Sequence, residues 1–101
     1  MRVIVFFDLP VETAAQRKEY SKFRRHLIKS GFMMMQESVY SKLALNGTSV
    51  NTITEDLRRN RPENGLIQIL IVTENQYSKI ETITGEFKSN LLDTDERLVI
   101  L

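Results

Sequence analysis

Apolar residues dominate the start of the chain, where residues 3–7 read Val-Ile-Val-Phe-Phe before the run ends abruptly at Asp8. β-Branched and aromatic residues are typical of strands, and this stretch is apolar on both of its alternating faces. Residues 66–72, Leu-Ile-Gln-Ile-Leu-Ile-Val, have the same character, and only Gln68 interrupts them. The pattern therefore predicts two strands that are apolar on both sides.

A long amphipathic helix is predicted over residues 12–31, soon after Asp8. Pro10 suits the first turn of this helix, Glu12 is placed near its positive end, and Gly31 supplies a C-terminal stop. The apolar positions that recur at helical spacing are Tyr20, Phe23, Leu27 and Ile28.

A second helix is predicted after the turn signal at residues 46–47, with Thr48 or Ser49 as its capping residue. Pro62 and the Asn-Gly pair at residues 64–65 mark where it has ended. Its apolar stripe consists of Val50, Ile53 and Leu57.

Three further segments have weaker or shorter patterns. Residues 32–45 are rich in strand-forming residues and fit either one bent strand or a short hairpin that breaks at residues 36–38. Within residues 74–95, Tyr77, Ile80 and Ile83 fit a short helical turn about as well as a strand. The chain closes on Arg-Leu-Val-Ile-Leu, residues 97–101, which predicts a late strand.

The order of these elements predicts an α+β fold of the ferredoxin-like kind, a split βαβ sandwich in one domain with an extra C-terminal strand. Two helices can cover only one face of the sheet, yet two strands are apolar on both faces. We expect the uncovered face to pack against a second copy about a two-fold axis, giving a homodimer. The strand at 66–72 lies at an edge, which residues 97–101 of the same chain or of the partner could cover.

The composition narrows the class of protein. A chain of 101 residues is long enough to bury a real core in one domain. The absence of cysteine excludes disulfides, thiolate zinc sites and cysteine nucleophiles, and it is compatible with a reducing compartment. Because Asp8 cuts the first apolar run far below secretory or membrane-spanning length, we expect a soluble cytoplasmic protein without a membrane partner.

The net charge of +1 conceals an asymmetry along the chain. Residues 12–30 carry six basic side chains and two acidic ones, whereas residues 74–101 carry three basic and six acidic ones. The basic side chains could contact nucleic-acid phosphates, or they could form an ordinary solvated helix face. Aromatic residues do not interleave with them, which favours contacts to a duplex backbone over base stacking. The candidate contacts are Arg17, Lys18, Lys22, Arg24, Arg25, Arg58, Arg59 and Arg61.

Asp8 is the candidate catalytic and metal-binding residue, although it could instead cap a helix that begins near Pro10. A two-fold axis near the end of the first strand would bring two copies of Asp8 together. Magnesium is usually held by one or two carboxylates with water and phosphate oxygens, so such a pair could bind magnesium or manganese and hydrolyse a phosphodiester. The single histidine, His26, is expected at the surface.

Taken together, these segments resemble the CRISPR-associated protein 2 family, especially members from systems with a single large effector nuclease. The resemblance spans essentially the whole chain. It rests on the Ile-Val-Phe-Phe-Asp-Leu-Pro start, the arginine-bearing first helix, the Gln-x-Ser-Val-Tyr core of residues 31–40, the strand at 66–72 and the C-terminal strand.

The resemblance implies a ferredoxin-like homodimer between copies of the CRISPR integrase, which helps to capture invader DNA for insertion as spacers. It also implies a metal-dependent endonuclease acting on RNA or duplex DNA, with Asp8 as metal ligand. Residues 97–101 would pair with the other subunit and contribute to integrase docking.

Two functions of different classes therefore remain open, a DNA-binding adaptor without catalytic activity and an endonuclease. A third, a regulatory dimer that binds a small ligand, has no obvious pocket in the sequence to support it. The segment around Met33–Met35 lacks the aromatic pattern of RNA-recognition motifs, and these methionines are expected to pack in a core or a subunit interface.

Overall fold

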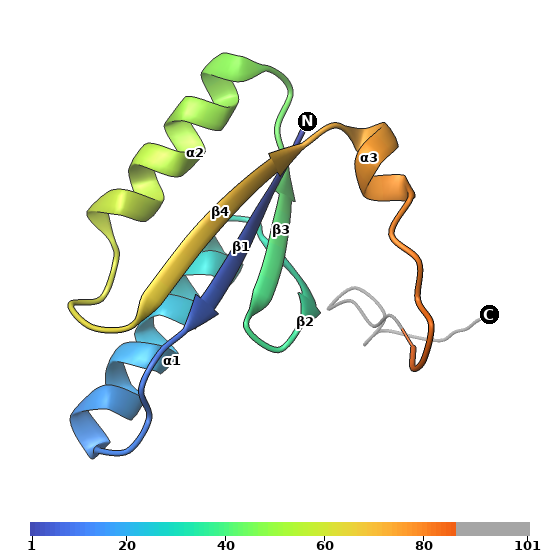
Figure 1. Cartoon of the computed structure of the whole chain (residues 1–101). Helices are drawn as coiled ribbons and strands as arrows, with labels where there is room; N and C mark the ends of the chain where they lie inside the picture. The colour runs from blue at the N-terminus through green and yellow to red at the C-terminus, as the bar shows by residue number, and fades with distance from the viewer. Residues whose placement is uncertain (87–101) are drawn as a thin grey trace.

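The computed structural model describes residues 1–86, and the predicted strand at 97–101 lies outside the described residues (Figure 1). No helix within residues 1–86 is long and apolar enough to cross a membrane. The elements follow in the order β1 (Arg2–Asp8), α1 (Ala14–Lys29), β2 (Met33–Gln36), β3 (Val39–Leu43), α2 (Gly47–Arg59), β4 (Leu66–Val72) and α3 (Glu74–Ser78).

The strands form one antiparallel sheet in the order β2-β3-β1-β4. β1 pairs with β3 on one side and with β4 on the other, so that Val5 lies opposite Tyr40 and also opposite Ile69. Helices α1 and α2 cover the same face of this sheet (Figure 1). This arrangement confirms the predicted ferredoxin-like α+β fold.

The core lies between the sheet and the two helices. Alternate residues of β1, namely Val3, Val5 and Phe7, face the helices and are almost completely buried. The ring centroids of Phe7 and Phe23 are 5.3 Å apart in an edge-on arrangement. Burial of each such side chain stabilises the fold by about 1.5–3 kcal/mol. Leu27 is buried with Phe23 as predicted, whereas Ile28 is exposed because it lies one helical step further round α1.

Residues 32–45 form a hairpin rather than one bent strand. β2 and β3 pair in antiparallel register, with a bulge between Met34 and Gln36. Ser38, in the connecting turn, has a φ of 66°, a conformation that non-glycine residues rarely adopt. Its carbonyl oxygen accepts a 3.0 Å hydrogen bond from the Phe7 backbone N–H, which holds the turn against β1.

The first helix begins at Ala14, so the prediction that Pro10 lies in its first turn was wrong, whereas Glu12 directly precedes the capping residue and lies near the positive end, as predicted. Thr13 is the N-terminal cap, and its side chain accepts a hydrogen bond from the backbone N–H of Gln16. The Gln16 side chain accepts in turn from the Thr13 backbone N–H. This reciprocal capping box satisfies two helix-end donors at once, which Pro10 cannot do.

The cap of the second helix also differs from the prediction. Asn46, rather than Thr48 or Ser49, caps α2, and its side-chain oxygen accepts a 2.9 Å hydrogen bond from the Ser49 N–H. The predicted stripe is largely confirmed, since Val50 and Leu57 are buried and Ile53 is half-buried.

α3 resolves part of the uncertain segment, because Tyr77 lies in this short helix while Ile80 and Ile83 follow it. Arg2 donates two hydrogen bonds to the Glu74 carboxylate, at 3.0 and 2.7 Å. The Arg2 guanidinium also lies 4.1 Å from the centre of the Tyr77 ring. The side-chain hydrogen bond from Arg2 holds the pKa of Glu74 below its usual value. These contacts hold α3 beside the start of β1.

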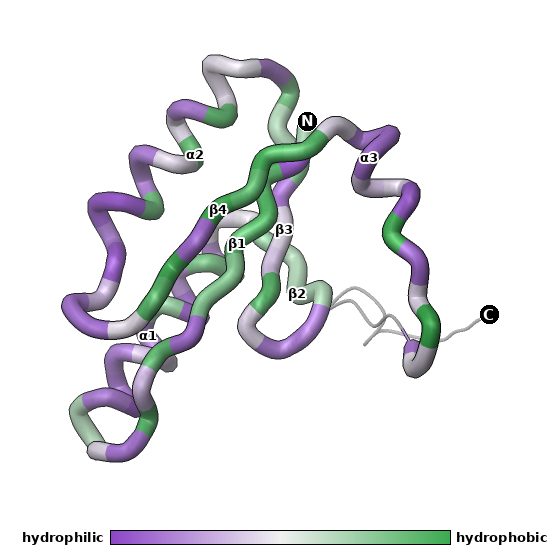
Figure 2. Tube along the Cα trace, in the orientation of Figure 1, coloured by the Kyte–Doolittle hydropathy of each residue, from purple (hydrophilic) through white to green (hydrophobic). Residues whose placement is uncertain are grey.

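The opposite face of the sheet has neither α1 nor α2 over it, and we call it the open face. Figure 2 shows that β1 and β4 are mainly hydrophobic along their length. On the open face, Phe6 is 37% exposed, Leu70 50% and Leu66 55%. The two strands are therefore apolar on both sides, as predicted. α1 and α2 cover only one of these sides, and α3 lies beside the other. Within the described residues, β4 is an edge strand.

Gly65 is packed tightly against the end of β1. Its φ is +106°, and a Cβ atom there would lie 2.6 Å from Leu9 Cδ2 and 2.9 Å from the Asp8 carbonyl oxygen. Gly85 has a similar φ of +100°, but a Cβ atom there would have no neighbour within 4 Å. A comparison of substitutions at the two glycines therefore distinguishes the cost of backbone strain from the cost of steric conflict.

We predict that Gly65→Ala lowers the free energy of unfolding by about 2–4 kcal/mol, because left-handed strain and overpacking add together. Gly85→Ala carries only the first cost and should lose about 1 kcal/mol. Urea denaturation of both variants measures the difference, and equal losses would contradict the role assigned to the close approach at Gly65.

A second prediction concerns pH. Because the folded-state pKa of Glu74 is lowered, its ion pair contributes stability above the ordinary pKa of 4.5 and loses it as the pH falls through the folded value. We expect the NMR signals of the Tyr77 ring to move toward those of Glu74→Gln as the pH drops below 4.5. The variant itself should show little change over this range. Glu81→Gln serves as the control, because it keeps Glu74 and its Tyr77 signals should still move as the pH falls. Loss of this movement in Glu81→Gln would contradict the assignment to Glu74.

Candidate functional site

Asp8 is the last residue of β1 and lies on the open face, opposite Leu66 of β4. It is exposed and borders a shallow cavity of about 190 Å³ that Phe6, Ser38 and Gln68 also line. Because Thr13 caps α1, Asp8 has no capping role, and the alternative interpretation of this residue was wrong. The carboxylate therefore extends from a rigid strand end on the apolar side of the sheet.

The metal-binding capacity of one chain at this place is limited. Residues 1–86 contain no group of three or more His, Cys, Asp or Glu side chains that could hold a metal ion. Asp8 supplies one carboxylate, and Ser38 and Gln68 supply neutral oxygen atoms in the same cavity. Magnesium sites usually have one or two carboxylates completed by water and substrate phosphates. The residues present thus fit an open or shared site better than a closed one.

Some of the predicted phosphate contacts have internal hydrogen-bond partners. Arg17 Nη1 donates to the carbonyl oxygens of Val11 and Glu12, both at 3.1 Å. Arg24 Nε donates a 2.8 Å hydrogen bond to the hydroxyl of the buried Tyr40. Arg17 therefore ties down the loop that follows Asp8, and Arg24 satisfies a buried hydroxyl. Neither structural role is apparent from the pattern of basic residues along the chain.

The remaining predicted basic residues are exposed, and the structure divides them into two sets. Lys18 and Arg25 lie on the surface of α1. Arg58 lies 3.7 Å from Glu55 on its own helix, a surface pair of little energetic weight. Lys22 of α1 meets Arg59, the last residue of α2, and Arg61, two residues further along the chain, around one cavity of about 130 Å³. The structure thus brings the two predicted basic clusters together, but on the helix layer and not beside Asp8.

His26 is not the free surface residue that the sequence suggested. Its Nε2 atom lies 2.8 Å from Asp56 Oδ2, and its side chain is 27% exposed. The pair joins α1 to α2, which explains why a histidine occurs on the otherwise basic helix. No local pattern could have revealed it, because the partner is 30 residues away in the chain.

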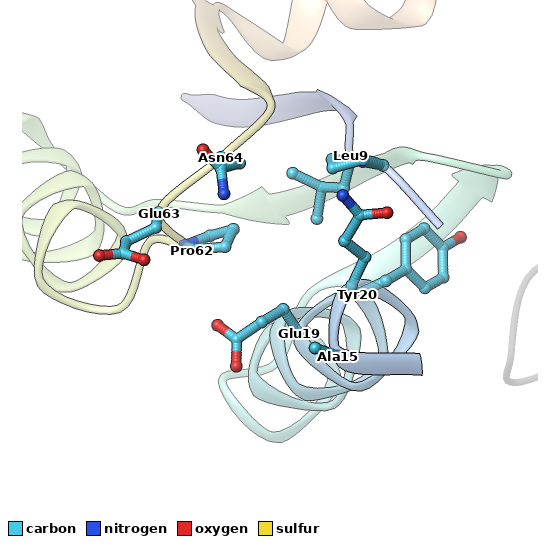
Figure 3. A pocket seen from close by; sticks show the side chains of 9 residues that line it. Leu9, Ala15, Glu19, Tyr20, Pro62, Glu63 and Asn64 are labelled. Atoms are coloured by element: carbon cyan, nitrogen blue, oxygen red, sulfur yellow. The ribbon is translucent and has the colours of Figure 1, made fainter. Parts of the chain in front are cut away.

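A cleft of about 190 Å³ separates the first half of α1 from the loop that precedes β4. Figure 3 shows Ala15, Glu19 and Tyr20 on the helix side, facing Pro62 and Glu63 of the loop. The two carboxylates give the rim negative charge. No local sequence pattern indicates this cleft, because α1 and the loop that form its walls lie more than 40 residues apart.

Comparisons with known proteins agree with the fold. A protein described as CRISPR-associated endoribonuclease Cas2 from Treponema denticola is 58% identical over 101 residues, covering all of both chains. One of the same description from Streptococcus mutans serotype c is 44% identical, covering all of this chain and 93% of the relative. The crystal structure of Streptococcus pyogenes Cas2 at pH 6.5 matches with a TM-score of 0.62 and 22% identity, covering 83% of this chain and 100% of that one.

The family model described as CRISPR associated protein Cas2 matches residues 1–80, which include every helix and strand described above. With this match and the full-length relatives, the chain belongs to the CRISPR-associated protein Cas2 family.

Proposed function

We propose that the protein is a cytoplasmic homodimer that partners the CRISPR integrase in spacer acquisition and cleaves RNA or duplex DNA with magnesium or manganese. The observation that carries the proposal is the position of Asp8 on the open, apolar face of the sheet. If this face packs against a second copy, both Asp8 side chains belong to one interface.

The open face supports the homodimer. Exposed Phe6, Leu66 and Leu70 form an apolar surface on β1 and β4, and such surfaces on small proteins commonly mark interaction sites. α3 and Ile80 border a further cavity of about 380 Å³ over the same face, which Ile4, Phe6 and Leu70 also line. Association of identical faces about a two-fold axis would bury this area symmetrically.

The chemistry at Asp8 follows from what this chain can supply. Each copy would contribute one carboxylate to the metal, and substrate phosphate oxygens and water would complete the coordination. A bound divalent cation supplies polarisation of the phosphodiester and a nucleophilic water. The Ser38 hydroxyl and the Gln68 amide border the same cavity and can orient the phosphate by hydrogen bonds. The relatives' names, which include endoribonuclease, support RNA as a substrate.

A purely structural DNA-binding adaptor is the second candidate. Two observations favour it: one chain supplies a single carboxylate at Asp8, and the basic cavity lies on the other side of the sheet. The small-ligand regulatory dimer receives no comparable support, because the cleft of Figure 3 has two carboxylates at an open rim.

We predict that Asp8→Asn abolishes magnesium-dependent cleavage, with a loss of at least about 100-fold, since even residues behind metal ligands contribute about 10–100-fold. The variant keeps the shape of the side chain, and the fold should be unchanged. Glu12→Gln, which changes another exposed carboxylate, should cut like the unmodified protein.

A spacer-acquisition assay of Asp8→Asn then separates the two candidates. Retained acquisition with lost cleavage would show that the role in integration is not catalytic. Undiminished cleavage by Asp8→Asn would place the activity elsewhere and contradict the proposed site.

For the homodimer, we predict that Leu70→Lys weakens self-association by about 100-fold or more, because an unpaired charge in an interface costs about 3 kcal/mol or more. Leu70 is half-exposed in the single chain, so the fold should tolerate lysine. Leu45→Lys, in the connection between β3 and α2, is the control and should leave association unchanged. Sedimentation equilibrium measures all three proteins, and a monomeric unmodified protein would refute the homodimer.

A further inference from the structure

The cavity between α1 and the end of α2 has an unusual concentration of positive charge, and we call it the basic notch. Its cationic side chains are Lys22, Arg59 and Arg61, and within residues 1–86 Glu19 is the carboxylate that lines the cavity beside them. Phe23, Asn60 and Pro62 complete the lining. We propose that the basic notch binds one phosphate group, which deepens the proposed nucleic-acid function and rests on it.

The local structure explains why the charges converge. Lys22 precedes Phe23, which is buried against the sheet, so the lysine emerges at the margin of the core. α2 ends at Arg59, and the chain turns there toward β4. Two helices packed on the same face of the sheet thus present cations to the same space from both sides.

The end of α2 would ordinarily repel an anion, because free carbonyl groups carry partial negative charge there. In this chain, the backbone N–H of Asn60 donates to the carbonyl oxygens of Asp56 and Leu57. Arg61 Nη1 donates a 2.8 Å hydrogen bond to the Arg58 carbonyl oxygen. These bonds occupy the carbonyl groups of Asp56, Leu57 and Arg58 in the last turn of the helix, and Arg61 keeps further N–H groups for a ligand.

The notch also differs from the other basic positions on the helix layer. The guanidinium groups of Arg17 and Arg24 donate hydrogen bonds to groups of the protein itself. Lys18 and Arg25 are exposed on α1 without contributing to the notch. Positive charge alone therefore does not identify the phosphate site. The site is identified by the place where α1 and the end of α2 bring their cations together.

The size and chemistry of the notch fit a phosphate. The cavity, with a volume of about 130 Å³, has room for a single phosphate group. Arginine binds phosphate oxygens through paired N–H groups, and lysine adds a compact charge. Among residues 1–86, Phe23 is the aromatic residue that lines the space, and it is buried, so these residues offer a base no exposed ring to stack on. The contact would position a backbone without reading its sequence.

The position of the notch has a mechanistic consequence. It lies at the same end of the sheet as Asp8, because α2 leads into β4 opposite that residue. It opens on the helix layer, however, whereas Asp8 is on the open face. The phosphate held in the notch is therefore not the one that Asp8 would cleave, and binding and cleavage are separable.

The test compares two double variants with the same change of charge on exposed residues. Lys22→Ala with Arg59→Ala removes two cations of the notch, and Lys29→Ala with Lys79→Ala, at two exposed residues outside the candidate contacts, is the charge-matched control. We expect the first to weaken duplex DNA binding about tenfold and to reduce the slope of log K against log salt by about 1, as for one lost phosphate contact. The control should change affinity about twofold or less. Equal losses in both would overturn the proposal.

Glu19→Gln provides the opposite change, because it removes the carboxylate beside the three cations. We expect this variant to bind duplex DNA a few-fold more tightly than the unmodified protein. Unchanged or weaker binding would contradict the placement of the phosphate in the notch.

Inorganic phosphate tests the notch independently of nucleic acid. Titration followed by NMR should shift the backbone amides of Asn60 and Arg61, and the Lys22→Ala, Arg59→Ala variant should lose the shifts. If the unmodified protein fails to bind duplex DNA but shows these shifts, the proposed function fails and the phosphate site stands. If the unmodified protein binds duplex DNA but phosphate causes no amide shifts, and the Lys22→Ala, Arg59→Ala variant binds DNA equally well, the phosphate site fails and the proposed function stands.

Discussion

β1 forms hydrogen bonds with a strand on each side and has apolar side chains on both faces, and the rest of the structure depends on this arrangement. On the helix-covered face, Val3, Val5 and Phe7 anchor the core. On the open face, Ile4, Phe6 and Asp8 follow one another at alternate positions of the strand. A strand fixed by two neighbours cannot slip by one residue without exchanging its two faces. The register that builds the core therefore also determines where the carboxylate emerges.

The same arrangement separates the two candidate surfaces. The open face combines apolar side chains with Asp8, whereas the helix layer contains the basic notch around Lys22, Arg59 and Arg61. In a domain this small, a sheet covered on only one face can offer a subunit contact on one side and phosphate contacts on the other. The self-association and the phosphate contact that we propose would thus use opposite faces of the described sheet.

The basic residues show how structure changes the meaning of a charge pattern. The sequence analysis treated eight of them as equivalent candidates for phosphate contacts. In the structure, Arg17 fixes the loop after Asp8 and Arg24 satisfies the Tyr40 hydroxyl. Both arginines are exposed and retain N–H groups that these hydrogen bonds do not use. Their positions, however, are determined by the contacts that they make within the fold. Lys22, Arg59 and Arg61 gain their significance from meeting in space, which no spacing along the chain indicates.

The sequence by itself determined the strands at the start of the chain and at residues 66–72, most of the helix stripes, the α+β fold and the family, because periodicity and the order of elements depend on neighbouring residues. It left open whether residues 32–45 form one bent strand or a hairpin, which the structure decided. It placed Asp8 at a strand end but could not exclude that this residue caps the first helix. The capping box of Thr13 and Gln16 in the structure excludes that role. Only the tertiary structure paired Arg2 with Glu74 and His26 with Asp56, which lie 72 and 30 residues apart. Such contacts, like the basic notch, arise when packing brings distant segments together, and no local pattern encodes them.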